Sequence, residues 1–527
     1  MCFSATKLIF FFISDKTFSH IIRYGFGIRF YVVFLRSITR MKRNFVINLC
    51  FLLFLNILVK PFWIFGVERS VQNIVGAEEF GIYFSLLNFS LLLNIILDMG
   101  ITNFNNRNIA QNRNLLDKSL SNLLALRLVL AVVYIAISMI VALCLGYELR
   151  QMKILGILVV NQFLQSMTLY LRSNVSGMQM FKTDSMLSVL DRLLMIIFCS
   201  ILVWGHVTDT PIKIEWFVLT QTAAYFITAL VAFLIVFSKT KHFRLNFQMK
   251  YFIAFIKQSF PYALLILLMA FYNRIDSVML ERMLPDGKEQ AGIYAQAFRI
   301  LEAASMFAYL FSVLLLPMFA RMIKQKQNVE GLCKTACVLI FVPAIALMSV
   351  CLFFNREIMG LMYFEHVETS SIVLAILMIG FVGICITYIF GTLLTSNGSL
   401  KYLNIMASCG MVLNIVLNFI LIPHYGVIGA AISSMITQLA TGLCQYIIAF
   451  RLFKFNFNLK FTIVTTLFVI ISVTVSYFAT MIDYNRWVVV CGAAVVCVLV
   501  AVALRVLDLR SAITVLKESL AKRKEKE

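Results

Sequence analysis

The chain has 527 residues, of which 61% are hydrophobic and only 13% are charged, and its mean hydropathy is +0.90. Soluble domains contain about 45–50% apolar and about 25% charged residues, so this composition excludes a water-facing globule and requires lipid as the solvent. The net charge of +21 does not indicate a nucleic-acid partner, because the basic residues are gathered in short connections and at the two ends. Long Leu, Ile, Val and Phe runs favour helices over a barrel, and we therefore predict an all-α polytopic membrane protein.

The first 40 residues are interpreted as a basic N-terminal extension. Their apolar stretch, 8–13, is too short to cross a bilayer, and no small-residue cleavage site of a signal peptide follows it. Met41 is followed by Lys42 and Arg43 and then by an apolar helix, which is a common beginning for an inner-membrane protein. We expect Met41 to be the native start, with 1–40 either an upstream extension or a poorly ordered basic arm.

Fourteen segments come close to the length of about 20 apolar residues that a helix needs to cross a bilayer. Their predicted cores are 45–65, 80–99, 121–146, 153–171, 186–205, 215–238, 260–283, 291–319, 332–354, 370–395, 400–421, 426–450, 461–481 and 487–507. The connections on one side of this series are rich in Lys and Arg, and those on the other side are poor in them. The positive-inside rule then places both termini in the cytoplasm, and we expect a multi-pass protein of the bacterial inner membrane.

Two short self-similarities predict two repeated halves. Residues 79–83 resemble 290–294, with Gly81 and Gly292 in register at an offset of 211 (292 − 81). A second pair around Gly177 and Gly398 has an offset of 221 (398 − 177). Each offset skips an even number of spans, so we predict two six-helix lobes related by a parallel pseudo-two-fold, plus a C-terminal helix pair. The predicted divisions are an N-lobe at 41–238, a cytoplasmic interfacial linker at 239–259, a C-lobe at 260–452, helices 13 and 14 at 453–509, and a basic cytoplasmic tail at 510–527.

Three cations lie deep in predicted spans and are candidate ligand-binding residues. Lys60, Arg274 and Arg299 reach a similar level near the midplane, at a rise of about 1.5 Å per residue. Pro61 is expected to disturb the first helix and to open backbone polar groups toward a cavity. A cationic cavity suits an anionic ligand, and Arg suits phosphate through its planar guanidinium. The competing interpretation is that these charges only pair with one another, as Arg299 and Glu302 can at i, i+3.

Two carboxylates, Asp276 and Glu302, are candidates for binding a coupling proton or Na⁺, and the alternative is that each is a fixed partner of a neighbouring Arg. Asn414 and Asn418 are expected to form hydrogen bonds between helices. The chain has no P-loop and no His, Cys or carboxylate cluster at metal-ligand spacing, so we expect neither a nucleotide nor a metal cofactor. Charges nearer the span ends are interpreted as structural: Asp98, Arg127, Asp191 and Arg192.

Three stretches resemble the polysaccharide-transporter, or O-antigen flippase, family, and together they cover most of residues 41–450. They are 79–83 (EFGIY) continuing to 97–101 (LDMGI); Arg274-Ile275-Asp276 with Met279-Leu280 and 291–294 (AGIY); and Asn414 and Asn418 with 421–423 (LIP) and 426–431 (GVIGAA). The resemblance implies the fold of the multidrug/oligosaccharidyl-lipid/polysaccharide exporter superfamily, in which two six-helix lobes enclose a cavity that opens alternately to each side. In that fold the first, second, seventh and eighth helices line the cavity, in agreement with the positions of Lys60, Arg274 and Arg299.

The resemblance also implies a substrate, an undecaprenyl-pyrophosphate-linked oligosaccharide of O-antigen, capsule or exopolysaccharide. Such a flippase moves this lipid-linked anion from the cytoplasmic to the periplasmic leaflet, coupled to H⁺ or Na⁺, and has no enzymatic activity. Its expected partners are membrane lipids and the glycan polymerase and glycosyltransferases of the same pathway. One alternative is a multidrug or cation exporter of the same fold, against which a cationic cavity argues. The other is a membrane glycan polymerase or ligase, which is expected to have a long external catalytic loop that is not seen here.

Overall fold

The computed structural model describes residues 59–102, 116–178, 180–205, 212–240, 249–455 and 459–504, and within these ranges the chain is helical with no strand. The predicted all-α membrane fold is confirmed: in the described part of the chain, 11 helices are long and apolar enough to cross a membrane. The predicted extension at 1–40, the start at Met41, most of the first span (45–58) and the tail at 510–527 lie outside the described residues.

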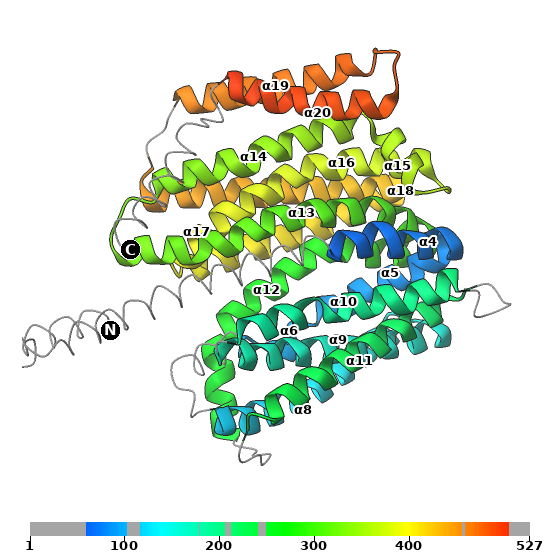
Figure 1. Ribbon diagram of the computed structural model, residues 1–527, viewed down its shortest axis with the longest axis vertical. Coiled ribbons are helices and arrows are strands. Elements are labelled where there is room, and N and C mark those ends of the chain that lie inside the picture. Colours follow the sequence, from blue (N-terminus) through cyan, green and yellow to red (C-terminus); the bar gives the residue numbers. More distant parts are fainter. Residues whose placement is uncertain are drawn as a thin grey trace, which may run out of the picture.

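The helices follow one another in three sets (Figure 1). The set called the N-lobe here comprises η1 (Trp63–Glu68), α4 (Arg69–Val75), α5 (Ala77–Leu92), α6 (Ile95–Asp98), α8 (Leu116–Cys144), α9 (Leu149–Gly177), α10 (Phe181–Trp204) and α11 (Ile214–Phe237). The C-lobe comprises α12 (Met249–Met283), α13 (Gly287–Lys324), α14 (Glu330–Phe353), α15 (Asn355–Met362), α16 (Val367–Ile386), η3 (Thr387–Gly391), α17 (Thr392–Ser396) and α18 (Leu400–Phe453). The terminal pair comprises α19 (Leu459–Ala479) and α20 (Arg486–Ala503).

Each predicted span from the third to the fourteenth corresponds to a described helix, with the eleventh and twelfth joined in α18. These two spans meet at a kink at Gly426, which has φ 54° and ψ −132° and follows Pro423 by three residues. A glycine is needed at the kink because L side chains rarely adopt a positive φ. The total of fourteen spans and the symmetry of the two lobes remain predictions.

Three predicted boundaries differ from the structure. The second span, 80–99, is interrupted between α5 and α6. The first helix continues through η1 and α4 to Val75, past its predicted end at 65, because Glu68 and Gln72 are buried against the C-lobe and are not exposed in a loop. Helix α12 begins at Met249, inside the predicted linker 239–259, so the last part of that linker is helical and continuous with the seventh span, Phe260–Met283.

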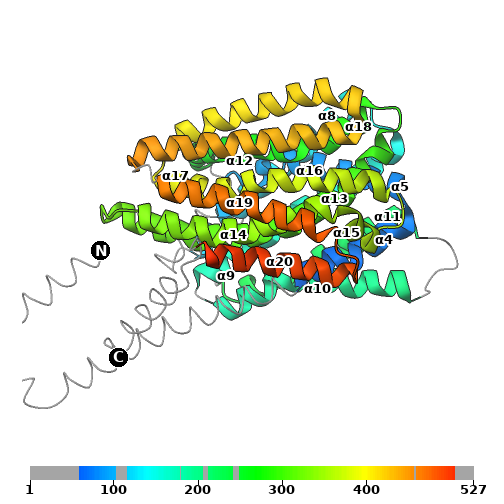
Figure 2. The ribbon, with the colours of Figure 1, turned by 90° about the horizontal axis from the view of Figure 1, so that it is seen from above.

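The two lobes meet at one end of the bundle, where α5 packs against α12 and α13 (Figure 1). Residues 291–301 of α13 are all buried, whereas large side chains further along the same helix, such as Phe307, Tyr309 and Met318, are exposed. The lobes are therefore in contact along the first half of α13 and diverge along its second half. Helices α19 and α20 pack against α14 on the periphery of the C-lobe (Figure 2).

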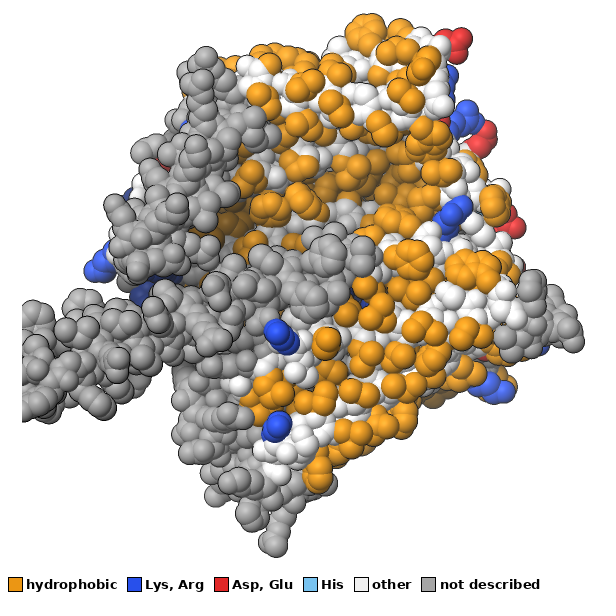
Figure 3. All heavy atoms as spheres, in the orientation of Figure 1, with side chains coloured by type: hydrophobic (Ala, Val, Ile, Leu, Met, Phe, Trp, Pro, Cys, Tyr) orange, Lys and Arg blue, Asp and Glu red, His pale blue; other side chains and the backbone are white. Residues whose placement is uncertain are grey.

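The surface agrees with a lipid environment. Hydrophobic side chains cover most of the described face in Figure 3, and the acidic side chains visible there lie mainly along one edge. Large apolar residues such as Val132, Ile140 and Leu499 are more than half exposed. An apolar belt of this extent is what helices in contact with lipid require.

Candidate functional site: a polar cavity between the lobes

A cavity of about 450 Å³ lies between the two lobes. Four of the five residues singled out from the sequence line it: Lys60, Arg274, Arg299 and Glu302. Its other lining residues come from the first helix, α5, α9, α10, α11, α13 and η3: Trp63, Ile64, Glu68, Tyr83, Leu87, Leu91, Leu158, Asn161, Gln162, Gln165, Arg192, Gln221, Tyr225, Ser305, Met306, Tyr309 and Tyr388. The cavity thus collects buried polar groups from helices that are far apart in the sequence.

The first helix is locally widened where it borders the cavity. Pro61 cannot donate a backbone hydrogen bond, and the π-helix η1 begins two residues after it. Single-turn π segments are common at functional sites because they redirect the side chains of one turn. Here Lys60, Ile64 and Glu68 all line the cavity from this helix. The disturbance predicted from Pro61 therefore has a structural counterpart in η1.

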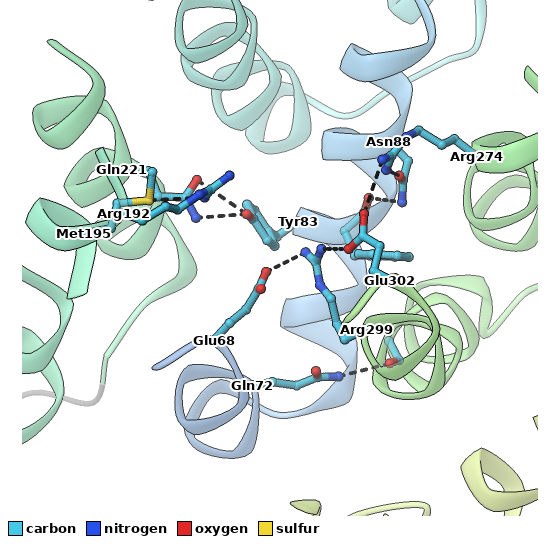
Figure 4. Close-up of polar contacts among 12 residues, drawn as sticks. Glu68, Gln72, Tyr83, Asn88, Arg192, Met195, Gln221, Arg274, Arg299 and Glu302 are labelled. Atoms are coloured by element: carbon cyan, nitrogen blue, oxygen red, sulfur yellow. Dashed lines mark hydrogen bonds and ion pairs between the residues drawn. The ribbon is translucent and has the colours of Figure 1, made fainter. Parts of the chain in front are cut away.

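A network of four charged residues crosses from the C-lobe to the N-lobe (Figure 4). Arg299 contacts the Glu68 carboxylate through Nη2 at 2.5 Å and donates through Nη1 to Glu302 Oε2 at 2.6 Å. The other carboxylate oxygen of Glu302 accepts from Arg274 Nη2 at 3.2 Å. Arg274 Nη1 donates to Asn88 Oδ1 on α5 at 2.9 Å. Two bonds of the network, Arg299 to Glu68 and Arg274 to Asn88, join the lobes.

The network is electrically balanced, since two guanidiniums face two carboxylates. The i, i+3 pairing of Arg299 with Glu302 considered from the sequence does form. Glu68 was not predicted, because it follows the apolar core of the first span and precedes Arg69, a pattern typical of a loop. A signal was present nevertheless: an unpaired Arg deep in a membrane is costly, and such a residue calls for a carboxylate on a neighbouring helix.

Arg192 is the second residue whose position the sequence did not predict. Its position near a span end predicts a structural charge, but it lines the cavity from α10. Its closest carboxylate in the described structure is Asp191, with Nε and Oδ2 4.0 Å apart, which is beyond hydrogen-bonding distance. Its guanidinium also lies 5.8 Å from the centre of the Trp63 ring and 3.6 Å from the Met195 sulfur.

Amides and phenols line the N-lobe wall of the cavity. Gln221 Nε2 donates to the Tyr83 hydroxyl at 2.9 Å, and Gln165 Nε2 donates to the Tyr225 hydroxyl at 2.6 Å. Asn161 lies on the same wall and has a buried Oδ1 without a hydrogen-bond partner. Neutral groups that both donate and accept suit a ligand rich in hydroxyls. Three polar residues of the predicted fourth span, 153–171, are thus cavity residues: Asn161, Gln162 and Gln165.

Asp276, the fifth candidate, lies outside the cavity in the interior of the C-lobe. Its Oδ1 accepts from Asn418 Nδ2 at 2.7 Å and from Asn414 Nδ2 at 3.0 Å, and its Oδ2 accepts from the Tyr294 hydroxyl at 3.0 Å. Within the described ranges it forms no ion pair with a Lys or Arg, so it is not the partner of Arg274. Asn414 and Asn418 thus form the hydrogen bonds between helices that the sequence predicts.

An ion pair outside the cavity fits the structural interpretation. Arg127 on α8 pairs with Asp98 at the end of α6 and donates to the Ser166 carbonyl at 2.8 Å. Its guanidinium also lies 4.8 Å from the centre of the Tyr170 ring. None of these residues lines the cavity. The pair therefore ties α6, α8 and α9 together.

Comparison with known proteins identifies a family and a fold. Residues 48–323 match the model of the family described as polysaccharide biosynthesis protein. The capsular polysaccharide biosynthesis protein CapF of Staphylococcus aureus is 26% identical over 184 residues, which are 34% of this chain and 45% of CapF. The chain therefore matches less than half the length of that relative.

Two solved structures show the fold. The lipid II flippase MurJ, in an inward closed conformation, gives a TM-score of 0.66 at 16% identity, over 86% of this chain and 98% of MurJ. An inward-facing multidrug resistance MATE family transporter of the MOP superfamily gives 0.56 at 15% identity, over 74% of this chain and 94% of the transporter. The family match confirms the family resemblance predicted from the sequence, and these two similarities confirm the predicted fold.

Proposed function

This chain belongs to the polysaccharide biosynthesis protein family, and we propose that it is a flippase for an anionic lipid-linked oligosaccharide. In this proposal an undecaprenyl-pyrophosphate-linked repeat unit of O-antigen, capsule or exopolysaccharide enters the cavity from the cytoplasmic leaflet and leaves to the periplasmic leaflet. The protein is a transport protein and not an enzyme, in keeping with the family and with the flippase and transporter that share its fold.

The single observation that carries the proposal is the cavity between the lobes, with four cations and a wall of amides and phenols. The four cations, Lys60, Arg192, Arg274 and Arg299, outnumber the two carboxylates of the lining, Glu68 and Glu302. The cavity therefore has a net positive charge (4 − 2 = +2), which suits a pyrophosphate. The amide and phenol wall provides partners for sugar hydroxyls. A cavity with both features suits an anionic headgroup that carries sugars.

We propose transport by alternating access. The lobes touch along the first half of α13 and diverge along the second half, so the cavity has one closed end. The positive-inside pattern assigns the contacting end to the periplasm and both termini to the cytoplasm, which is consistent with an inward-facing state. Rocking of the lobes would open the contacting end while the polyprenyl tail stays in the bilayer.

Ion coupling is proposed at Asp276. A hard cation such as Na⁺ takes carboxylate, amide and hydroxyl oxygens, and this residue is hydrogen-bonded to Asn414, Asn418 and Tyr294. Asn418 Oδ1 is buried without a hydrogen-bond partner, and rotation of the amides would turn oxygens toward a cation. The alternative carboxylate, Glu302, is occupied by two Arg residues and suits this role less well.

The second candidate function is export of a multidrug or cationic substrate by the same fold. The carboxylates of the cavity, Glu68 and Glu302, would be its ligands. Both are already in contact with Arg299, which makes the cavity a poor cation site. The flippase function is favoured for that reason. The glycan polymerase and glycosyltransferases of the same pathway are its proposed partners, and the bacterial inner membrane is its proposed location.

The test is transfer of a fluorescent undecaprenyl-pyrophosphate-linked oligosaccharide between leaflets of proteoliposomes that contain the full chain. We expect transfer by the wild type and transfer at least about tenfold slower by Arg274→Ala, as for loss of one charge-assisted interaction. Arg356→Ala, which changes a side chain that is 66% exposed and outside the cavity, is the matched control. Absence of transfer by the wild type with the cognate glycan, or export of a cationic dye instead, would refute the flippase.

A further inference from the structure

The four cations of the cavity fall into two pairs with different surroundings. Arg274 and Arg299 are each within hydrogen-bonding distance of a carboxylate. In the described structure Lys60 has no ion pair, and Arg192 has only a long contact of 4.0 Å with the adjacent Asp191. We infer that Lys60 and Arg192 form the subsite that holds the pyrophosphate group, and that Arg274 and Arg299 chiefly hold the lobes together. This inference rests on the flippase function proposed above and assigns the headgroup contacts within it.

The central network is a poor anion site because its charges are already paired. An incoming pyrophosphate would have to displace Glu302 from Arg274, or Glu68 from Arg299. Each displaced carboxylate would stay beside the bound anion and repel it. Arg299 is also confined, with a side chain that is 10% exposed between Glu68 at 2.5 Å and Glu302 at 2.6 Å.

Lys60 presents an uncompensated charge to the cavity. In the described structure its ammonium takes part in no hydrogen bond and no ion pair. Its charged neighbours include two cations, Arg192 and Arg172, and one carboxylate, Asp191. Arg172 is itself paired with Asp184 at 2.8 Å and does not line the cavity. Within the cavity, the cation that repels the Lys60 ammonium without being hydrogen-bonded to a carboxylate is therefore Arg192. A bound dianion would remove this repulsion.

Arg192 has neighbours that orient its guanidinium, and in the described structure none of them is a carboxylate within hydrogen-bonding distance. Trp63, Met195 and Tyr225 are uncharged, and Asp191 is 4.0 Å away and is not a lining residue. Figure 4 shows the guanidinium next to Gln221, on the side of Tyr83 away from Glu302. Arg192 and Lys60 come from α10 and the first helix, both in the N-lobe, so a pyrophosphate held by them would not bridge the lobes.

This division of roles matches the two tasks of a flippase. The planar guanidinium of Arg192 can donate to two phosphate oxygens, and Lys60 adds a compact point charge. The amide and phenol wall includes Tyr225, which neighbours Arg192 and accepts from Gln165, so the first sugar would follow the pyrophosphate along this wall. Binding on one lobe leaves the network between the lobes free to break when the protein changes state.

The test is binding of inorganic pyrophosphate to the purified full chain in detergent at low ionic strength, measured by isothermal titration calorimetry. We expect Lys60→Gln and Arg192→Gln each to weaken binding about tenfold or more, as for loss of one charge-assisted hydrogen bond. Arg192→Lys should bind pyrophosphate more tightly than Arg192→Gln and less tightly than the wild type, because it keeps the positive charge but lacks the planar pair of guanidinium donors. Lys182→Gln, which removes an exposed cation from the same helix α10, is the control and should bind as the wild type does.

A smaller loss for Arg274→Gln than for Lys60→Gln supports the division of roles. The inference is overturned if Arg274→Gln or Arg299→Gln abolishes pyrophosphate binding while the Lys60 and Arg192 variants bind normally, or if the wild type does not bind pyrophosphate. Thermal unfolding of each variant shows whether it is folded. If Arg192→Gln does not fold, Lys60→Gln and Arg192→Lys decide the question.

The two proposals can fail separately. The first outcome is that the wild type transfers the lipid-linked oligosaccharide, while the Lys60 and Arg192 variants bind pyrophosphate as tightly as the wild type. It refutes the inference and leaves the proposed flippase function standing. Pyrophosphate binding that depends on both residues, without transfer of any lipid-linked oligosaccharide, supports the anion subsite and refutes the flippase.

Discussion

Gly81 and Gly292 face each other's helices in reciprocal contacts at the end of the bundle where the lobes meet. A Cβ on Gly81 would lie 1.8 Å from the Lys288 carbonyl oxygen, and a Cβ on Gly292 would lie 1.9 Å from the Ala77 carbonyl oxygen. Each carbonyl belongs to the residue four positions before the opposite glycine (292 − 4 and 81 − 4). Helices α5 and α13 therefore approach backbone to backbone in one register, as a local two-fold relation between the lobes would require.

Gly292→Ala is expected to destabilise the closed end, because its Cβ would force α5 and α13 apart. Overpacking of this kind costs about 1–3 kcal/mol. Thermal unfolding in detergent should show a lower midpoint, and a cross-link between Ala77→Cys and Lys288→Cys should form less readily. Gly492→Ala in α20 is the control, because nothing lies within 4 Å of its Cβ. Equal stability of Gly292→Ala and wild type would contradict this packing.

The Glu68–Arg299 pair should be strongly coupled, because both side chains are at least nine-tenths buried and the contact is 2.5 Å. Removing one partner of a buried pair typically costs about 3–5 kcal/mol, since it leaves an uncompensated charge. We expect Glu68→Gln and Arg299→Gln each to lower the free energy of unfolding. The double variant should lose about 0.5–3 kcal/mol less than the sum of the two.

Arg356 and Glu368 form the control pair for this cycle. Their side chains are 66% and 80% exposed, and exposed pairs contribute about 0–1 kcal/mol. The same double-mutant cycle on this pair should give a coupling near zero. Strictly additive losses for Glu68 and Arg299 would show that the network does not hold the lobes together.

The sequence predicted the helices well and the buried polar contacts only in part. Long apolar runs define spans because a bilayer demands a fixed length, which explains why the spans from the third onward have matching helices. Lys60, Arg274 and Arg299 were found because charge at membrane depth is costly. Depth along a helix is readable from residue count, whereas the direction of a side chain around the helix axis depends on the packing of its neighbours.

Glu68, Arg192 and Asp276 show where this kind of reasoning stops. Glu68 lies beyond the apolar core of its span, so its burial depends on a partner that comes more than two hundred residues later. Arg192 is near enough to a span end to reach water, and only the fold turns it into the cavity. Asp276 is two residues from Arg274, yet the two side chains belong to different clusters because they leave α12 in different directions.

Glu281 should stabilise the contact between the lobes at the closed end. From α12 it accepts hydrogen bonds from Ser85 Oγ at 2.6 Å and from Gln151 Nε2 at 2.5 Å, both in the N-lobe. Glu281→Gln keeps the shape but replaces one acceptor oxygen by a donor, which leaves a buried group unsatisfied at about 1–3 kcal/mol. Hydrogen exchange at the adjoining ends of α5 and α9 should become faster. Glu289→Gln, which changes a more exposed partner of His366, should leave it unchanged.

Asp276→Asn should abolish the response of transfer to an ion gradient while leaving pyrophosphate binding intact. The residue lies outside the cavity and its only described partners are neutral, so its charge is available to a cation. In proteoliposomes, an imposed Na⁺ or proton gradient should accelerate transfer by the wild type and not by the variant. If Na⁺ is the coupling ion, saturating Na⁺ should also raise the midpoint of thermal unfolding of the wild type and leave that of the variant unchanged. Binding to the folded state stabilises it by about 2.7 kcal/mol when the Na⁺ concentration is a hundred times Kd.

Glu302→Gln is the decisive comparison for this assignment. Both oxygens of Glu302 are taken by Arg274 and Arg299, so a cation would have to compete with two guanidiniums for it. We expect slower transfer by Glu302→Gln at every gradient, because the network between the lobes is weakened. The ratio of the transfer rate with an ion gradient to the rate without one should stay the same as in the wild type. If Glu302→Gln loses that ratio and Asp276→Asn keeps it, the coupling carboxylate lies in the cavity, and the cluster around Asp276 serves only to pack α12 against α18.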